Sequence, residues 1–172
     1  QGLKAEISTV HLDSQILEAV KTFNPEIVGV DAPLSLPEKG GLRPCDRLLI
    51  ARGIRVLPPT LGGMRLLTLR AVKLKEKIEA EGVKVIECFP GAVKILFNLP
   101  KRFPPSEAAE ALERLGLKLE KRRLSRHEVD GALVAITARL HLENLTETIG
   151  DPETGQIVIP KPEALKWLTR KI

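Results

Sequence analysis

Two short apolar segments of the chain each end in an acidic residue. Ile27–Val30 leads into Asp31, and residues 83–86 lead into Glu87. The first segment is a short β-branched run with little alternation, as in a buried parallel strand, the second contains the apolar residues Val83, Val85 and Ile86, and a proline follows each acid within three residues. In open α/β sheets, ligands and catalytic groups collect at the carboxyl ends of the strands. The sequence therefore predicts two carboxylates at one functional edge of a sheet.

A third acid, Asp130, stands one residue away from the apolar stripe of an expected helix. Residues 125–128 have the pattern S-x-x-E, a capping box that marks a helix start. The expected buried stripe of this helix consists of Val129, Leu133, Ile136 and Leu140. A carboxylate against such a stripe is costly to desolvate unless it is paired or bound to a cation.

Taken together, the three acids provide the hard oxygen ligands, from several elements, that a divalent-metal site for phosphoryl transfer needs. Taken singly, each acid is equally well explained as a helix cap, a salt-bridge partner or an exposed residue. Both interpretations are kept at this point.

The elements that must position these acids alternate along the chain. We expect strands at residues 5–10, 27–31 and 83–88, and helices at residues 13–24 (capped by Asp13 or Ser14), 45–52, 64–81, 107–114 and from 125 onward. Loops rich in Pro and Gly separate several of them. This alternation predicts an α/β protein.

Length and composition predict one soluble domain over residues 1–172, since 172 residues with 43% hydrophobic content suffice for one core. No apolar run approaches the length of a membrane span, and the first residues do not have the features of a signal peptide. We therefore expect a cytoplasmic protein without a membrane partner. Cys45 and Cys88 lack C-x-x-C spacing, which favours buried thiols over a disulfide framework or a zinc site.

The net charge of +5 and the pI of about 9.4 suit a polyanionic partner such as nucleic acid. Mixed stretches such as KLKEKIEAE are equally typical of a solvated helix face, whereas the one-sided clusters 101–102 and 121–123 either contact phosphates or serve solubility. The 3% aromatic content argues against base stacking and leaves backbone contact with RNA or DNA. Few Asn and Gln beside many charged residues is a composition compatible with a thermophile.

Four segments carry a resemblance to a known family: VGVDAPLSLP, RPCDRLLIARGIRVLPPTLGGMRLLTLRA, VIECFPGA and HEVDGALVAITA. In this order they resemble the signature blocks of the predicted-nuclease family called domain of unknown function 429 (DUF 429), from about Lys4 to the GDPETGQIVIP stretch. The resemblance implies a ribonuclease H-like (RNase H-like) fold, with a mixed, mainly parallel sheet flanked by helices. It also implies Asp31, Glu87 and Asp130 as catalytic residues that bind Mg²⁺ or Mn²⁺ and hydrolyse phosphodiester bonds in nucleic acid.

The matching blocks also contain Arg43, Asp46, Pro59, Arg65 and Arg70. As substrate-binding residues, arginines facing a metal-bound phosphate would neutralise charge in the transition state. Ion pairing with local acids explains the same arginines equally well.

The chain departs from the family at its start. The family's first strand carries an aspartate in a GIDxA-like block, and nothing like it precedes Gln1. The chain resembles a member that lacks roughly thirty residues, about the size of one βαβ unit. We therefore expect an incomplete site with little nuclease activity, and an unpaired sheet edge that favours a homo-oligomer.

Other functions remain as alternatives. One is a non-catalytic nucleic-acid-binding or assembly module on the same fold. Another is a nucleotide phosphotransferase, because actin-like kinases share the RNase H-like core, although the chain has no GxxxxGK[ST] loop. Ser35 and Ser125 lack a nucleophile-elbow context, and the three histidines are not spaced like a zinc cluster. His127 either assists proton transfer beside Asp130 or is a capping or exposed residue.

Overall fold

The computed structural model of the chain describes residues 3–120 and 123–170, so that Lys121 and Arg122 of the basic cluster lie outside the described residues. This part contains seven helices and six strands. In chain order they are β1 (Leu3–Ala5), α1 (Asp13–Phe23), β2 (Ile27–Val30), α2 (Pro44–Ala51), α3 (Gly63–Ala80), β3 (Lys84–Glu87), α4 (Pro90–Leu96), α5 (Ala108–Glu113), β4 (Leu117–Leu119), α6 (Arg126–Leu142), β5 (Thr146–Asp151), β6 (Gly155–Pro160) and α7 (Ala164–Thr169). The predicted α/β class is confirmed.

The described strands form three two-stranded sheets. β1 pairs with β4 and β2 with β3, both in parallel, and β5 pairs with β6 in an antiparallel hairpin. A single bridge between Cys88 and Val158 connects the end of β3 to β6. Strand pairing is thus mixed and mainly parallel, but the strands do not join into one continuous sheet.

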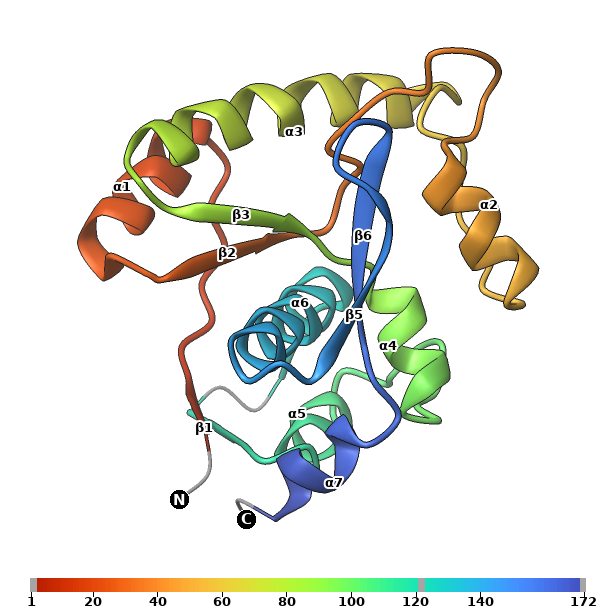
Figure 1. The fold of residues 1–172 in the computed structure, drawn as a ribbon. Coiled ribbons are helices and arrows are strands. Elements are labelled where there is room, and N and C mark those ends of the chain that lie inside the picture. Colours follow the sequence, from red (N-terminus) through yellow and green to blue (C-terminus); the bar gives the residue numbers. More distant parts are fainter. Residues whose placement is uncertain (1–2, 121–122, 171–172) are drawn as a thin grey trace.

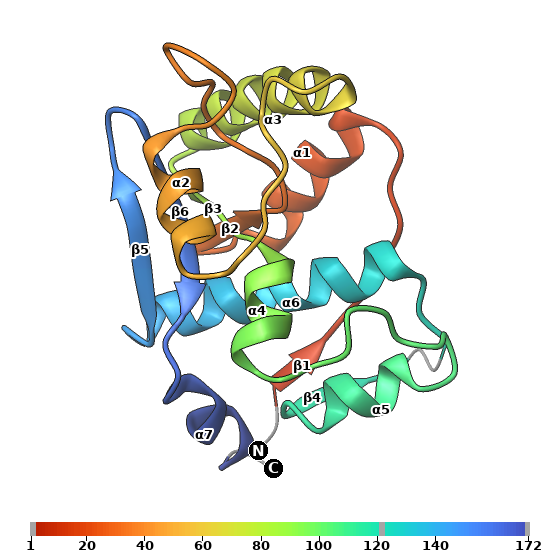
Figure 2. The same ribbon diagram turned by 90° about the vertical axis from the view of Figure 1, so that its right-hand side faces the viewer.

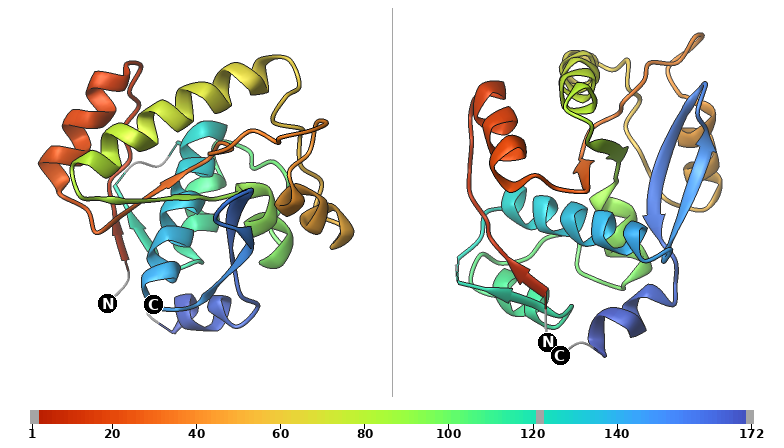
Figure 3. Two further views of the ribbon diagram at one scale, coloured as in Figure 1. Left: turned by 45° about the horizontal axis from the view of Figure 1, so that its top comes forward. Right: turned by 60° about the vertical axis from the view of Figure 1, so that its left-hand side comes forward.

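The long helix α6 lies between these sheets. Figure 1 shows α3 on one side of the β2–β3 pair and α6 on the other, and Figure 2 shows α6 between that pair and the β1–β4 pair. In Figure 3, α1 and α3 lie on the side of β2 and β3 that faces away from α6. The expected stripe of α6 is buried against α5, β4 and α7, while Val134 and Ala138 face β2 and β3. Because it is covered on two sides, α6 is apolar around much of its circumference.

The capping box predicted at the start of α6 is confirmed. The Ser125 Oγ accepts a hydrogen bond from the N–H of Glu128 at 3.3 Å, and the Glu128 carboxylate accepts one from the N–H of Ser125 at 2.8 Å. The cap predicted for α1 is wrong: the N-cap residue is Leu12, and the side chain of Gln15 accepts hydrogen bonds from the N–H groups of His11 and Leu12.

We expect Ser125→Ala to lower the free energy of unfolding by about 1 kcal/mol, because an N–H of the first turn of α6 loses its acceptor. Urea denaturation measures this difference. The control is Ser14→Ala, which replaces a serine inside the first turn of α1 that caps nothing. An equal loss of stability in the two variants would contradict the capping role of Ser125.

Two expectations about strands need correction. Residues 6–10 form no strand, because β1 ends at Ala5, and β4 was not expected at all. Cys45 and Cys88 are buried free thiols, as predicted, and burial raises the pKa of Cys45 to about 12. No helix within residues 3–120 and 123–170 combines the length and the apolar character needed to cross a membrane.

Candidate functional site at the end of strand β2

The two strand-end acids point to opposite faces of the β2–β3 pair. Val30 lies opposite Glu87 in the parallel register, so Asp31, one residue further along, is directed to the other face. Val30 packs in the cluster beneath α1 and α3, whereas Cys88 packs against Val134 of α6. Asp31 therefore belongs to the α6 side and Glu87 to the α3 side. The sheet itself separates two acids that share one edge in the sequence-based prediction.

On the α6 side, Asp31 lies near Asp130, which is in the second turn of α6. Asp130 is held by two cations: its Oδ1 is 2.5 Å from the Lys94 Nζ, and its Oδ2 is 3.7 Å from the Arg126 Nε. The side chains of Lys94 and Asp130 are only 10% and 14% exposed, so this pair is largely shielded from water. Asp31 has no hydrogen bond or ion pair with any residue that the structure describes. Asp130 thus has two cationic partners, whereas Asp31 has none among the described residues.

The surroundings of Asp31 raise the pKa of its carboxyl from 3.8 to about 6. Burial is the largest cause and repulsion from Asp130 the second, while Lys94, Arg126 and His127 act in the opposite direction. The residue has exposed surface, yet enough protein surrounds the carboxyl to weaken its hydration. A carboxyl that titrates near neutral pH beside a second carboxylate is typical of functional sites.

Lys94 belongs to this site and was not found from the sequence. It lies in α4, which begins at Pro90 directly after the loop that leaves β3, and the residue is buried. The available signal was a lysine within the apolar stretch GAVKIL, because a buried lysine requires an acidic partner.

On the α3 side, Glu87 is bound to Arg43. The Arg43 Nη1 and Nη2 donate to the two Glu87 carboxylate oxygens at 2.7 Å each, and the Leu34 N–H donates to Glu87 at 2.8 Å. Arg43 also binds Asp46 through Nε at 3.0 Å and Nη2 at 2.8 Å. Arg43 and Asp46 are 1% exposed and Glu87 is 6% exposed. We call Arg43, Asp46 and Glu87 the buried triad.

The buried triad is charged and internally satisfied. Burial acts to lower the pKa of Arg43, but the hydrogen bonds that it donates to Glu87 and Asp46 outweigh burial and raise this pKa, so the guanidinium stays protonated. Burial raises the pKa of Glu87, and Arg43 and the Leu34 N–H counteract this. Two forked arginine–carboxylate contacts give the triad a defined geometry. It connects α2 to the end of β3.

The remaining residues singled out in the sequence lie elsewhere. Arg70 is exposed and pairs with Asp13 of α1 at 2.6 Å, so the ion-pairing interpretation holds for Arg70 as it does for Arg43. Arg65 is exposed on α3, and Pro59 is buried in the preceding loop. Within the described residues, neither Arg65 nor Arg70 forms a hydrogen bond or ion pair with Asp31 or Asp130.

The three acids do not fit a metal site as a set of three. Glu87 is on the other face and its oxygens are already bound to Arg43 and Leu34. In the described part of the chain, no group of three or more His, Cys, Asp or Glu side chains is placed so as to hold a metal ion. Asp31 and the Asp130 Oδ2, which has only the 3.7 Å ion pair with Arg126 among the described residues, do fit a different mode, since Mg²⁺ is often bound by one or two carboxylates together with waters and substrate phosphates.

A groove of about 390 Å³ lies beside the start of α6. Residues 5–10 form one wall, and His127, Glu128, Gly131 and Ala135 of α6 contribute to the other. The groove therefore lies along the same helical turns that carry Asp130.

The fold and site define an α/β protein with a pair of carboxylates at the end of a parallel strand. Residues 3–154 match the family described as "Protein of unknown function (DUF429)", and the chain belongs to this family. No curated protein and no solved structure matches the chain. The predictions of one domain, a nucleic-acid partner, self-association and a cytoplasmic location stay predictions.

Proposed function

We propose that the chain is a nuclease with an RNase H-like fold that hydrolyses phosphodiester bonds at Asp31 and Asp130. One observation carries this proposal: two carboxylates, one from the end of β2 and one from α6, lie close enough to repel each other. Lys94, Arg126 and His127 surround them. Carboxylates that meet at the end of a parallel strand, among cations, suit an acid–base or metal-assisted reaction on a phosphate.

The chain's own residues have separate tasks. Lys94 and Arg126 hold Asp130 in one position through ion pairs. The positive charges of Lys94 and Arg126 attract a phosphate group of the substrate. Asp31, which has no such partner among the described residues, is the oxygen donor free to take up a cation or a proton.

Mg²⁺ or Mn²⁺ would be held by Asp31 and Asp130, with waters and substrate oxygens completing its ligands. When bound, the ion neutralises charge on the phosphate and lowers the pKa of water. Glu87, Arg43 and Asp46 have no part in this step, since they form the buried triad on the α3 side. The net charge of +5 favours the approach of nucleic acid.

The test is magnesium- or manganese-dependent cleavage of labelled RNA, DNA and RNA–DNA hybrids. We expect Asp31→Asn and Asp130→Asn each to lower the cleavage rate at least about a hundredfold, because each removes an acid–base group or ligand. The matched control is Asp151→Asn, which changes an exposed aspartate in the β5–β6 turn.

Loss of cleavage in the two site variants, with activity retained in Asp151→Asn, supports the proposal. If the chain cleaves none of these substrates but binds nucleic acid in a salt-sensitive manner, the proposal is overturned in favour of a binding module.

A further inference from the structure

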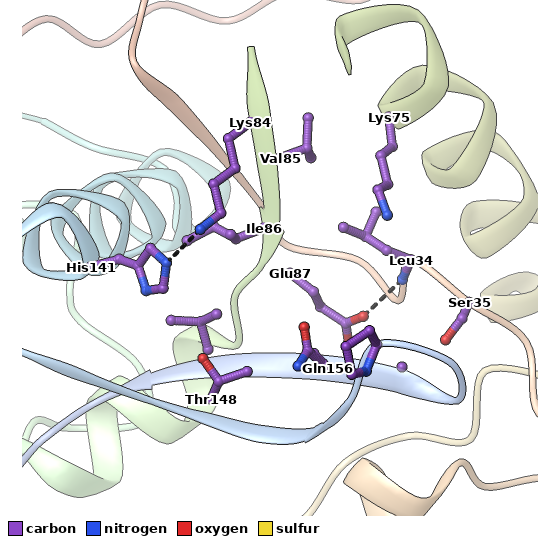
Figure 4. Close-up of a pocket in the computed structure, with 13 residues that line it drawn as sticks. Leu34, Ser35, Lys75, Lys84, Val85, Ile86, Glu87, His141, Thr148 and Gln156 are labelled. Atoms are coloured by element: carbon purple, nitrogen blue, oxygen red, sulfur yellow. Dashed lines mark hydrogen bonds between the residues drawn. The ribbon is translucent and has the colours of Figure 1, made fainter. Parts of the chain in front are cut away.

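A second pocket lies on the outer side of β3, away from the carboxylate pair. Its volume is about 170 Å³, and it opens between β3, α3, the end of α6 and the β5–β6 hairpin. In Figure 4, Lys75 comes from α3 on one side of β3, and Lys84 extends on the other side toward His141; Thr148 and Gln156 belong to the hairpin. Five elements of the chain thus bring polar side chains to one small space.

The pocket has an excess of positive charge. Lys75 and Lys84 line it, and Glu87 is the one acid among the described lining residues. The Glu87 oxygens already accept three hydrogen bonds from Arg43 and the Leu34 N–H. Asp46, the second acid of the buried triad, does not line the pocket. Arg43 supplies one positive charge for the two carboxylates of the buried triad, so one negative charge remains beside the two lysines and the pocket keeps a net positive charge.

Lys84 faces another nitrogen base instead of an acid. Its Nζ is 3.0 Å from the His141 Nε2, and the His141 Nδ1 is 2.8 Å from the Thr146 Oγ1. A charged ammonium must donate to a neutral Nε2, so Nδ1 carries the imidazole proton and donates to Thr146. The other two N–H donors of Lys84 have no acceptor within the described residues. Lys75 has only a distant ion pair, 3.9 Å from Glu79.

We propose that this pocket binds a phosphate group, either as inorganic phosphate or as the phosphate end of a small phosphate monoester. Two lysines from different elements and the hydroxyl and amide donors of Thr148 and Gln156 match the several acceptor oxygens of such an anion. Burial and the neighbouring Lys84 lower the pKa of His141. A bound anion counteracts the effect of Lys84.

The size of the pocket limits the ligand. Pockets for drug-sized molecules measure roughly 300–1,000 Å³, so a space of about 170 Å³ holds a phosphate group but not a whole nucleotide. A larger phosphate ester would extend past the rim, where Lys84 and Thr148 are exposed.

The experiment is a titration of the chain with inorganic phosphate and, separately, with glycerol phosphate, at pH 7 and constant ionic strength. Backbone and imidazole NMR signals report binding. We expect saturable shifts of the His141 ring and of residues 84–87, and a rise in the titration midpoint of His141 at saturation. Lys84→Gln and Lys75→Gln should each weaken phosphate binding about tenfold or more, because each removes a charge-assisted hydrogen bond.

Lys73→Gln is the matched control, since Lys73 is an exposed lysine on the same helix as Lys75 and does not line the pocket. Equal weakening in Lys73→Gln, or shifts that rise linearly without saturation, overturns the proposal. Tighter binding of glycerol phosphate than of inorganic phosphate identifies an ester as the ligand, and the reverse identifies free phosphate. Asp31→Asn should leave this binding unchanged, so the result is independent of the proposed nuclease activity. Lys75→Gln provides the same test if Lys84→Gln does not fold.

Discussion

Arg43→Met is expected to lower the free energy of unfolding by about 3–5 kcal/mol, because it leaves two buried carboxylates without their cation. Arg43 donates to both Asp46 and Glu87 at 2.7–3.0 Å, and all three residues are at most 6% exposed. Methionine fills much of the volume of the arginine stem but donates no hydrogen bond. The loss of unfolding free energy therefore measures the effect of removing the charge and not an effect of lost packing. Guanidinium denaturation followed by circular dichroism measures it.

The matched control is Arg52→Met, which removes a similarly forked arginine–carboxylate pair on the surface. Arg52 donates to Glu147 at 2.8 Å through two nitrogens, but both side chains are 46% exposed. Exposed pairs contribute about 0–1 kcal/mol, so this variant should be nearly as stable as the wild type. A cost for Arg43→Met that is no larger than the cost for Arg52→Met would show that the buried triad is not a stabilising unit.

A triple variant extends this test. Replacing Asp46 and Glu87 by leucine in the Arg43→Met background removes the uncompensated charges, so it should regain much of the lost stability. The same variant should retain the shape of the Asp31–Asp130 site, which lies on the other face of β2 and β3.

Asp31→Asn is expected to stabilise the folded protein at pH 7 by on the order of 1 kcal/mol. Its carboxyl has a pKa of about 6 in the folded chain and 3.8 as an ordinary aspartate, so the folded state disfavours the charged form. A shift of this size corresponds to at most about 3 kcal/mol, and solvent screening of an exposed residue reduces it. Asparagine has nearly the same shape and no charge. It therefore removes the burial and repulsion penalties together.

The stabilisation should depend on pH with a defined sign. Well below pH 4, Asp31 is protonated in both the folded and the unfolded wild-type chain. The wild type and Asp31→Asn should therefore be equally stable there. Between about pH 4 and 6 the folded wild type binds more protons than the unfolded chain, so its stability falls as the pH rises. Above about pH 6 the difference in the free energy of unfolding between Asp31→Asn and the wild type should be constant. Thermal unfolding in the presence of a chelator, at a series of pH values, measures it.

Asp130→Asn is the informative comparison, because Asp130 is paired with Lys94 at 2.5 Å. Its replacement leaves the buried Lys94 without its partner and should destabilise the chain. If Asp31→Asn were destabilising as well, the two acids would both be structural. Opposite signs would identify Asp31 as a residue whose charge costs stability, which is the usual signature of a functional position.

Local sequence signals predicted several elements of this protein correctly. The S-x-x-E box places the start of α6, because both of its hydrogen bonds lie within three residues. The positions of β2 and β3 followed from short β-branched runs, and Asn24 ends α1 in a left-handed conformation. The sequence also singled out Asp31, Glu87 and Asp130, whose role as site residues stays a prediction.

The hairpin β5–β6 and the strand β4 were not predicted from the sequence. Their strand conformation depends on pairing with another strand and not on a pattern within their own residues. β4 has three residues, too few for a periodic pattern, and it exists through its parallel pairing with β1. Strand 5–10 was expected from composition, but the chain pairs only at Leu3–Ala5. Tertiary contacts here outweigh intrinsic propensity.

By itself, the sequence determined that the chain is an α/β protein, that Asp31 and Glu87 end two strands, and that Asp130 lies early in a helix. Only the tertiary structure decided which of these acids meet. The register of β2 on β3 sets Val30, and not Asp31, opposite Glu87, and this offset of one residue directs the two carboxylates to opposite faces. Arg43, the N-cap residue of α2, then pairs with Glu87, and Lys94 of α4 pairs with Asp130. Strand register depends on contacts between distant parts of the chain, and no signal within a few residues encodes it.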